Sequence, residues 1–185
     1  TEDECDFLRG LPREHLISTE VCPQHFTLTV PECYEKLGTL AQMNPPIRTK
    51  RHADALWQAL KDGIIDCIAT DHAPHTLAEK EQPYGKAPSG MPGVETSLAL
   101  MLDRVNRKAC SLQEVVFWMS TSPANLYQMQ GKGRIEVGQD ADLVLVDMAL
   151  KKTVRNGQLH TRVNWSPYHG MELQGWPVRT IVNGQ

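Results

Sequence analysis

A short apolar run that ends in a cluster of ionisable side chains places the strongest limit on the fold of this chain. The run occupies residues 64–69, is rich in isoleucine and follows Gly63, so it predicts a buried parallel strand. Thr70, Asp71 and His72 follow it, and Pro74 prevents the strand from continuing. Because α/β barrels place their chemistry at the carboxyl ends of parallel strands, Asp71 is a candidate site residue. A solvated turn that holds a structural histidine is the alternative.

Helical and strand patterns alternate around this run and predict an α/β fold. The spacing of apolar residues predicts amphipathic helices over residues 2–11, 50–62 and 94–108, and a strand over residues 16–22. Residues 77–93 hold three prolines and three glycines, which predicts an irregular loop that is either functional or disordered. The pattern changes from about Gly131, where strands are expected at residues 141–147, 154–159 and 178–183.

Composition excludes several classes of partner. The chain has 185 residues and a net charge of −3, which gives no electrostatic reason to expect nucleic acid or an anionic membrane. No apolar run reaches the roughly 18 residues of a transmembrane helix. The five cysteines never occur as C-x-x-C, so we expect reduced thiols in a cytoplasmic protein rather than structural zinc or a disulfide framework.

Seven segments, taken in order, resemble the carboxyl-terminal part of dihydroorotases in the amidohydrolase superfamily. They are E-V-C-P-Q-H at residues 20–25, M-N-P-P-I-R at 43–48, I-D-C-I-A-T-D-H-A-P-H at 65–75, E-K at 79–80, P-S-G-M-P-G-V-E-T at 88–96, G-Q-D-A-D-L-V-L-V-D at 138–147, and W-S-P-Y with G-W-P-V near the end. Within the superfamily, Asn44 and His75 favour the dihydroorotases over hydantoinases and allantoinases.

The resemblance implies a metal-bearing (β/α)8 barrel with a small β-sandwich. Such a barrel needs about 250 residues, so residues 1–130 are expected to form its carboxyl-terminal portion and residues 131–185 part of the sandwich. The family's H-x-H pair, its carboxylated lysine and its other metal histidines would lie upstream of Thr1. The resemblance therefore implies a binuclear zinc site to which Asp71 contributes one ligand, and a 185-residue piece that is inactive alone.

The same resemblance assigns roles to particular side chains. Asp71 would act as general base and acid, taking a proton from a zinc-bound hydroxide and returning it to the leaving amide nitrogen. Asn44 and His75 would bind the cyclic substrate, since Asn offers both a donor and an acceptor. The segment Pro88, Ser89 and Gly90 resembles the loop that contacts substrate in the family. His72 is expected to have a supporting or structural role.

Three functions remain open on the sequence. The first is reversible opening of dihydroorotate to N-carbamoyl-aspartate in pyrimidine biosynthesis. Gln24 stands where many dihydroorotases have histidine, and with Ser89 it keeps a hydantoinase-type substrate open. The third is a metal-free scaffold for aspartate transcarbamoylase. A small-molecule substrate is the expected partner, with a homodimer or association with that transcarbamoylase as further expectations.

Overall fold

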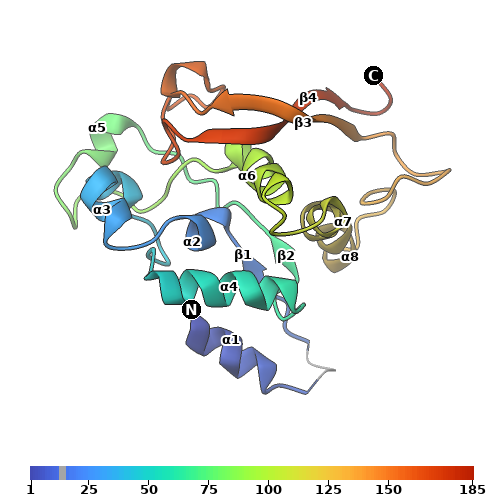
Figure 1. Cartoon of the computed structure of the whole chain (residues 1–185), viewed down its shortest axis with the longest axis horizontal. Helices are drawn as coiled ribbons and strands as arrows, with labels where there is room; N and C mark the ends of the chain where they lie inside the picture. The colour runs from blue at the N-terminus through green and yellow to red at the C-terminus, as the bar shows by residue number, and fades with distance from the viewer. Residues whose placement is uncertain (13–15) are drawn as a thin grey trace. The chain divides into compact units, whose positions relative to one another are not determined.

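The computed structural model describes residues 1–12 and 16–185, and its helices and strands follow one another as Figure 1 shows. The elements are α1 (Glu2–Arg9), β1 (Glu20–Val21), α2 (Pro23–Thr27), α3 (Glu32–Leu37), η1 (Gly38–Ala41), α4 (Lys50–Lys61), β2 (Cys67–Ile68), α5 (Leu77–Lys80), α6 (Val94–Asn106), α7 (Leu112–Val116), η2 (Phe117–Thr121), α8 (Ser122–Leu126), β3 (Leu143–Thr153), η3 (Asn156–Gln158) and β4 (Glu172–Ile181). The chain divides into two compact units. Among the described residues, no helix has the length and apolar character needed to cross a lipid bilayer.

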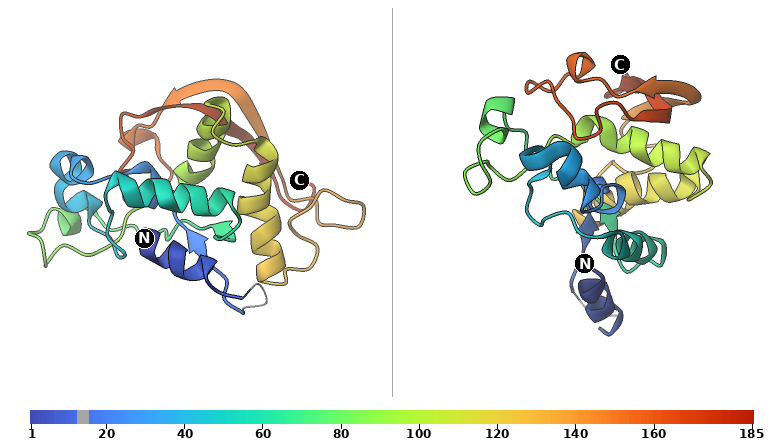
Figure 2. Two further views of the ribbon diagram at one scale, coloured as in Figure 1. Left: turned by 60° about the horizontal axis from the view of Figure 1, so that its bottom comes forward. Right: turned by 60° about the vertical axis from the view of Figure 1, so that its left-hand side comes forward.

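The first unit, Thr1–Glu95 with Arg155–His169, is built on a parallel pair of strands. Strand β1 pairs with β2 in the register Glu20↔Cys67 and Val21↔Ile68, which confirms the mixed α/β character and the parallel strand expected near residue 65. Helix α4 contacts α2 and α1, and α1 lies alongside it in Figures 1 and 2. Helix α4 buries Ala53, Ala59 and Leu60 on one face, as its apolar spacing predicts.

A separate apolar cluster in the first unit lies beside the candidate substrate segments. Its buried members are Cys33, Ala41, Met43, Ile47, Met91 and Trp165. Met43 and Ile47 bracket the Asn44-Pro45-Pro46 turn, and Met91 follows Gly90 directly. The side chain of Trp165 is 1% exposed, and its Nε1 donates to the carbonyl oxygen of His75 at 2.7 Å. This apolar cluster therefore supports three candidate substrate segments, namely the Asn44 turn, His75 and the segment at Gly90.

The second unit, Thr96–Val154 with Gly170–Gln185, joins α6 to an antiparallel pair of strands. Strands β3 and β4 pair from Leu143↔Ile181 to Thr153↔Glu172, with two irregularities in the register. The amide Nδ2 of Asn106 on α6 donates to the carbonyl oxygens of Met148 and Gln174 at 3.0 and 2.8 Å. These bonds satisfy backbone groups of both strands, and the strand pair lies against α6 in Figures 1 and 2.

Two local expectations from the sequence were wrong. Residues 77–80 form the short helix α5 inside the expected irregular loop, because Thr76 and Glu79 make a reciprocal capping box at its start. Residues 156–158 form the 3-10 helix η3 instead of the turn of a strand, and Arg155–His169 belongs to the first unit. The assignment of residues 1–130 to a barrel and 131–185 to a sandwich stays a prediction.

Candidate functional site

Asp71 lies where the chain leaves β2, and its backbone has an unusual conformation. Its φ angle is +44°, in the left-handed region that residues other than glycine seldom adopt and that Asp and Asn tolerate best. The side chain is exposed and lines a cavity of about 590 Å³ within the first unit. Backbone strain of this kind persists where surrounding structure imposes it, and it concentrates at functional sites.

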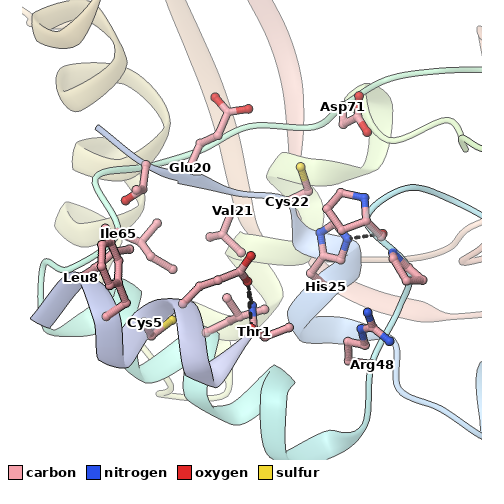
Figure 3. A pocket seen from close by; sticks show the side chains of 16 residues that line it. Thr1, Cys5, Leu8, Glu20, Val21, Cys22, His25, Arg48, Ile65 and Asp71 are labelled. Atoms are coloured by element: carbon pink, nitrogen blue, oxygen red, sulfur yellow. Dashed lines mark hydrogen bonds and ion pairs between the residues drawn. The ribbon is translucent and has the colours of Figure 1, made fainter. Parts of the chain in front are cut away.

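The cavity has one apolar end and one polar end (Figure 3). Leu8, Cys5 and Ile65 lie at the left of that view, whereas Asp71, His25 and Arg48 lie at the right. A cavity with mostly apolar walls and a few convergent polar groups is the usual form of a small-molecule site. Asp71 is the carboxylate at its polar end.

His25 lines the same cavity as this carboxylate, and the sequence had not assigned it a role. It follows β1 in the chain as Asp71 follows β2, so the parallel pairing brings both residues to the same edge of the sheet. Its Nε2 lies 2.9 Å from the carbonyl oxygen of Pro45, which can only accept. Burial lowers the pKa of His25, while the Pro45 carbonyl and the charge of Asp71 oppose that effect. The position of His25 shortly after a predicted strand is the sequence signal that could have identified it as a candidate site residue.

Cys22 is excluded as a nucleophile in this cavity. Its side chain is 8% exposed, and burial, followed by the charge of Asp71, raises the pKa of the thiol to about 12. A thiol with that pKa stays protonated at neutral pH, and the neutral thiol is a poor nucleophile. Other ionisable side chains on the cavity wall include Asp71, His25 and Arg48 at the polar end and, besides them, Glu4 and Glu20.

Gln24 supports the backbone next to Asp71. Its side chain is 1% exposed, and Nε2 donates to the carbonyl oxygen of Thr70 at 3.1 Å. Thr70 immediately precedes Asp71, so a buried amide ties α2 to the turn that carries the carboxylate. The position that departs from many dihydroorotases thus makes a structural contact in this chain.

Residues 71–75 and 88–93 run side by side and hold His75, Ser89 and Gly90 together. The amide of Ala73 donates to the carbonyl oxygen of Met91 at 3.2 Å. The Nε2 of His75 lies 3.1 Å from the carbonyl oxygen of Ser89, to which it must donate. A neutral His75 with its proton on Nε2 then has an acceptor at Nδ1, so it would receive a hydrogen bond from substrate rather than donate one.

Asn44 and Pro88 complete the set of predicted site residues. Asn44 is exposed at the turn before Pro45, and neither it nor His75 lines the cavity that contains Asp71. Pro88 is half-buried and its carbonyl oxygen accepts from the Nζ of Lys80 at 2.9 Å. The described structure thus joins His75, Pro88, Ser89 and Gly90 in one hydrogen-bonded assembly, and places Asp71 with His25.

His72 has the supporting role expected from the sequence. Its Nδ1 accepts hydrogen bonds from the backbone N–H groups of Gly93 and Val94 at 3.1 and 3.2 Å. Val94 is the first residue of α6, whose first N–H groups have no acceptor within the helix. The imidazole therefore caps the start of α6 and ties the Asp71 turn to residues 93 and 94 of the same unit.

We expect His72→Ala to lower the free energy of unfolding by about 1–2 kcal/mol, as loss of a helix cap does. His72→Asn is the matched control, because its amide oxygen can occupy the place of Nδ1 and keep most of the stability. Urea unfolding followed by circular dichroism measures both variants. Equal loss of stability in His72→Ala and His72→Asn would show that the cap is not the cause.

A metal centre cannot be assembled from the described residues alone. Within residues 1–12 and 16–185, no three His, Cys, Asp or Glu side chains are grouped as a metal ion requires. Asp71 fits as one oxygen ligand, since a carboxylate at the end of a strand suits zinc. The donor set described for this chain thus fits part of a metal site only.

Comparison with known proteins gives matches over the whole chain. A model of the amidohydrolase family matches residues 3–185. A dihydroorotase from Halobacterium salinarum is 41% identical over 165 residues, which cover 89% of this chain and 39% of that protein. A dihydroorotase from Ruminiclostridium cellulolyticum is 40% identical over 186 residues, which cover 100% and 43%. The chain thus spans about two fifths of the length of these curated relatives.

Solved structures give the same grouping. An L-hydantoinase (dihydropyrimidinase) from Arthrobacter aurescens has a TM-score of 0.93 at 32% identity, with 100% of this chain and 42% of that chain covered. A D-hydantoinase (dihydropyrimidinase) from a Thermus species has a TM-score of 0.87 at 30% identity, with 100% and 41% covered. Since the family model covers nearly every residue and the relatives agree with it, the chain belongs to the amidohydrolase family.

Proposed function

We propose that the complete protein is a zinc-dependent cyclic amide hydrolase that opens dihydroorotate reversibly to N-carbamoyl-aspartate. The observation that carries the proposal is a carboxylate, Asp71, at the end of a parallel strand and on the wall of a small-molecule cavity. Relatives named dihydroorotase at about 40% identity support the choice of reaction. We also propose that β1 and β2 are adjacent strands of a (β/α)8 barrel.

Asp71 would move the proton of this reaction. A bound zinc ion lowers the pKa of a water molecule from 15.7 to about 7 and so supplies a nucleophile at neutral pH. The carboxylate of Asp71 accepts the proton of the attacking oxygen as the bond to the ring carbonyl carbon forms. It then delivers this proton to the ring nitrogen as the C–N bond breaks, which leaves Asp71 ionised again. A carboxylate suits both steps because it can accept and return a proton.

The other predicted residues would bind the ring. Asn44 offers an amide donor and acceptor, which matches the alternating N–H and C=O groups of a cyclic imide. His75 would accept from a ring N–H at Nδ1, given the hydrogen bond of Nε2 to Ser89. Ser89 and the backbone at Pro88 and Gly90 would form the wall on the other side. These roles are proposals for the complete protein.

A hydantoinase-type reaction is the second candidate. The TM-score of 0.93 to an L-hydantoinase and the presence of Gln24 favour it. A shared fold does not by itself decide the substrate, because one fold can host several functions. The two substrates differ in charge, because dihydroorotate carries a carboxylate and hydantoin does not. Arg48 at the polar end of the cavity favours the charged substrate.

The deciding experiment compares kcat/KM of the complete protein on dihydroorotate, hydantoin and dihydrouracil. We expect dihydroorotate to be preferred by at least about tenfold, the discrimination that one charged contact gives. Removal of metal with a chelator should abolish turnover, and added zinc should restore it. A preference for hydantoin would establish the second candidate. No turnover on any substrate with zinc present, together with binding of aspartate transcarbamoylase, would establish a scaffold instead.

A further inference from the structure

A buried lysine lies at the centre of the candidate substrate segments. The side chain of Lys80 is 0% exposed, which is rare for lysine unless its ammonium group has partners. Its Nζ donates to the carbonyl oxygens of Gln42, Pro88 and Gly90 at 2.7, 2.9 and 2.8 Å. The ammonium form has three N–H donors, so three carbonyl acceptors match it fully.

The three acceptors belong to two segments that are distant in the sequence. Gln42 leads through the buried Met43 into Asn44, whereas Pro88 and Gly90 stand on either side of Ser89. Two further bonds join the segments: the Gly90 amide donates to the Gln42 carbonyl oxygen at 3.0 Å, and Gln42 Nε2 donates to the Ala87 carbonyl oxygen at 2.8 Å. Lys80 thus adds its three bonds to a junction between the Asn44 turn and the Ser89 turn.

The chain also connects Lys80 rigidly to His75. Helix α5 begins directly after Thr76, whose hydroxyl accepts from the Glu79 amide while the Glu79 carboxylate accepts from the Thr76 amide at 2.7 Å. Lys80 is the last residue of this helix. The capping box therefore sets the direction in which the lysine enters the junction. His75 lies just before α5, Asn44 lies just after Gln42 and Met43, and Ser89 lies between Pro88 and Gly90. All three are therefore close in the chain to the lysine or to a carbonyl group that it binds.

Burial affects the charge of this group without removing it at neutral pH. It lowers the pKa of Lys80 to about 8, so most molecules keep the ammonium form at pH 7. A neutral amine would have two N–H donors for three carbonyl oxygens, in one buried and two part-buried bonds. A carbonyl oxygen that loses its donor destabilises its segment, so the charged form of Lys80 suits this position better than the neutral form.

We propose that Lys80 is a positioning residue that sets the separation between Asn44 and the turn at residues 88–90, and thereby the fit of a cyclic amide substrate. The proposal rests on the proposed function for the role of Asn44, His75 and Ser89. Lys80 itself touches no reacting atom. Asp71 is held by different contacts, namely the Gln24 bond to Thr70 and the pairing of β1 with β2.

Because Asp71 is held by contacts that do not involve Lys80, Lys80→Met in the complete protein should affect substrate binding and not the chemical step. Methionine fills a similar volume but donates no hydrogen bond, so the two turns lose their common partner. We expect KM for dihydroorotate to rise about ten- to hundredfold while kcat stays within about threefold, because misplaced binding groups weaken substrate and transition state alike. Hydrogen exchange of the Gly90 amide should become at least about tenfold faster, and that of the Ala69 amide, which donates to Val21 in the strand pair, should not change.

Lys86→Met is the matched control, since Lys86 is an exposed lysine of the same segment. It removes the same charge and should leave KM, kcat and both exchange rates unchanged. If Lys80→Met does not fold, Lys80→Gln replaces it, because two N–H donors remain and a smaller rise of KM is expected. Unchanged KM with unchanged exchange at Gly90 would overturn the proposal. So would a fall of kcat and thermal stability at constant KM, which indicates a general structural role.

The failure of the proposed function would be recognised separately. If the wild-type complete protein opens none of the cyclic amides, the reaction assignment is wrong. The exchange of the Gly90 amide in Lys80→Met would still decide whether Lys80 holds the two turns together. If the Gly90 amide still exchanges slowly in that variant, Lys80 does not hold the two turns together, whatever the substrate is.

Discussion

Asp71→Asn is expected to reduce kcat of the complete protein by about 10²–10⁴-fold, the usual contribution of a general acid or base. The amide cannot accept the proton of the attacking oxygen and return it to the ring nitrogen. Asparagine is the informative replacement, because it tolerates the left-handed backbone that Asp71 adopts at φ +44°. The fold should therefore persist, and the thermal midpoint should stay within about 2 °C, which corresponds to a small free-energy change.

Asp66→Asn serves as the control for this experiment. Asp66 precedes β2, and its Oδ2 accepts from the Thr19 amide at 2.7 Å, away from the polar end of the cavity. The change removes the same charge but keeps an oxygen that can accept this bond, so kcat should change by less than about threefold. If Asp71→Asn keeps more than a tenth of wild-type turnover, Asp71 is not the base and the proposed reaction scheme is wrong.

Gly90→Ala should produce the largest loss of stability among simple substitutions near the site. The residue has a φ of +129°, a conformation that L side chains rarely adopt. A Cβ here would lie 2.7 Å from both Cβ and the carbonyl oxygen of Ala73, and 3.3 Å from Cδ2 of His75. Strain and overpacking together should lower the free energy of unfolding by about 2–5 kcal/mol.

The same substitution should disturb function, because the clash pushes against the turn between Asp71 and His75. Gly85→Ala is the control in the same segment: Gly85 has a φ of +87°, but a Cβ there meets nothing within 4 Å. It should lose only about 1 kcal/mol from backbone strain. Urea unfolding and kcat/KM measured on both variants separate strain from collision. Equal effects of the two substitutions would contradict the contact with Ala73.

Elements defined by local pattern were predictable from the sequence. The helix expected at residues 50–62 appears as α4 (Lys50–Lys61), and that expected at 94–108 appears as α6 (Val94–Asn106). Both owe their place to apolar residues that recur at the helical period. The strand expected over residues 64–69 was recognised from its short, isoleucine-rich apolar run, although only Cys67–Ile68 form the ladder with β1. The strands expected at residues 16–22 and 64–69 are shorter in the structure, whereas those expected at 141–147 and 178–183 extend as β3 and β4. Strand length depends on a pairing partner distant in the chain, which local pattern does not show.

The misses occurred where a local rule competed with a distant contact. The Asn156-Gly157 pair suits a hairpin turn, but Asn156 instead uses its side-chain oxygen to accept from the Ser166 amide at 3.1 Å. The capping box at Thr76 was readable from the sequence but was outweighed by the prolines and glycines that follow. His25 was placed after a strand but was given no role, because its place beside Asp71 depends on the pairing of β1 with β2.

The sequence by itself determined the family motifs, the alternation of helices and strands, and the choice of Asp71, since each of these is written in adjacent residues. The tertiary structure alone decided that Lys80 is buried, that Gly90 lies against Ala73, and that His72 caps α6. A lysine between two glutamates looks like a surface residue, and the local pattern contains nothing to the contrary. Its burial follows from three carbonyl groups that converge only when residues 42 and 88–90 meet, and that convergence is a property of the folded chain.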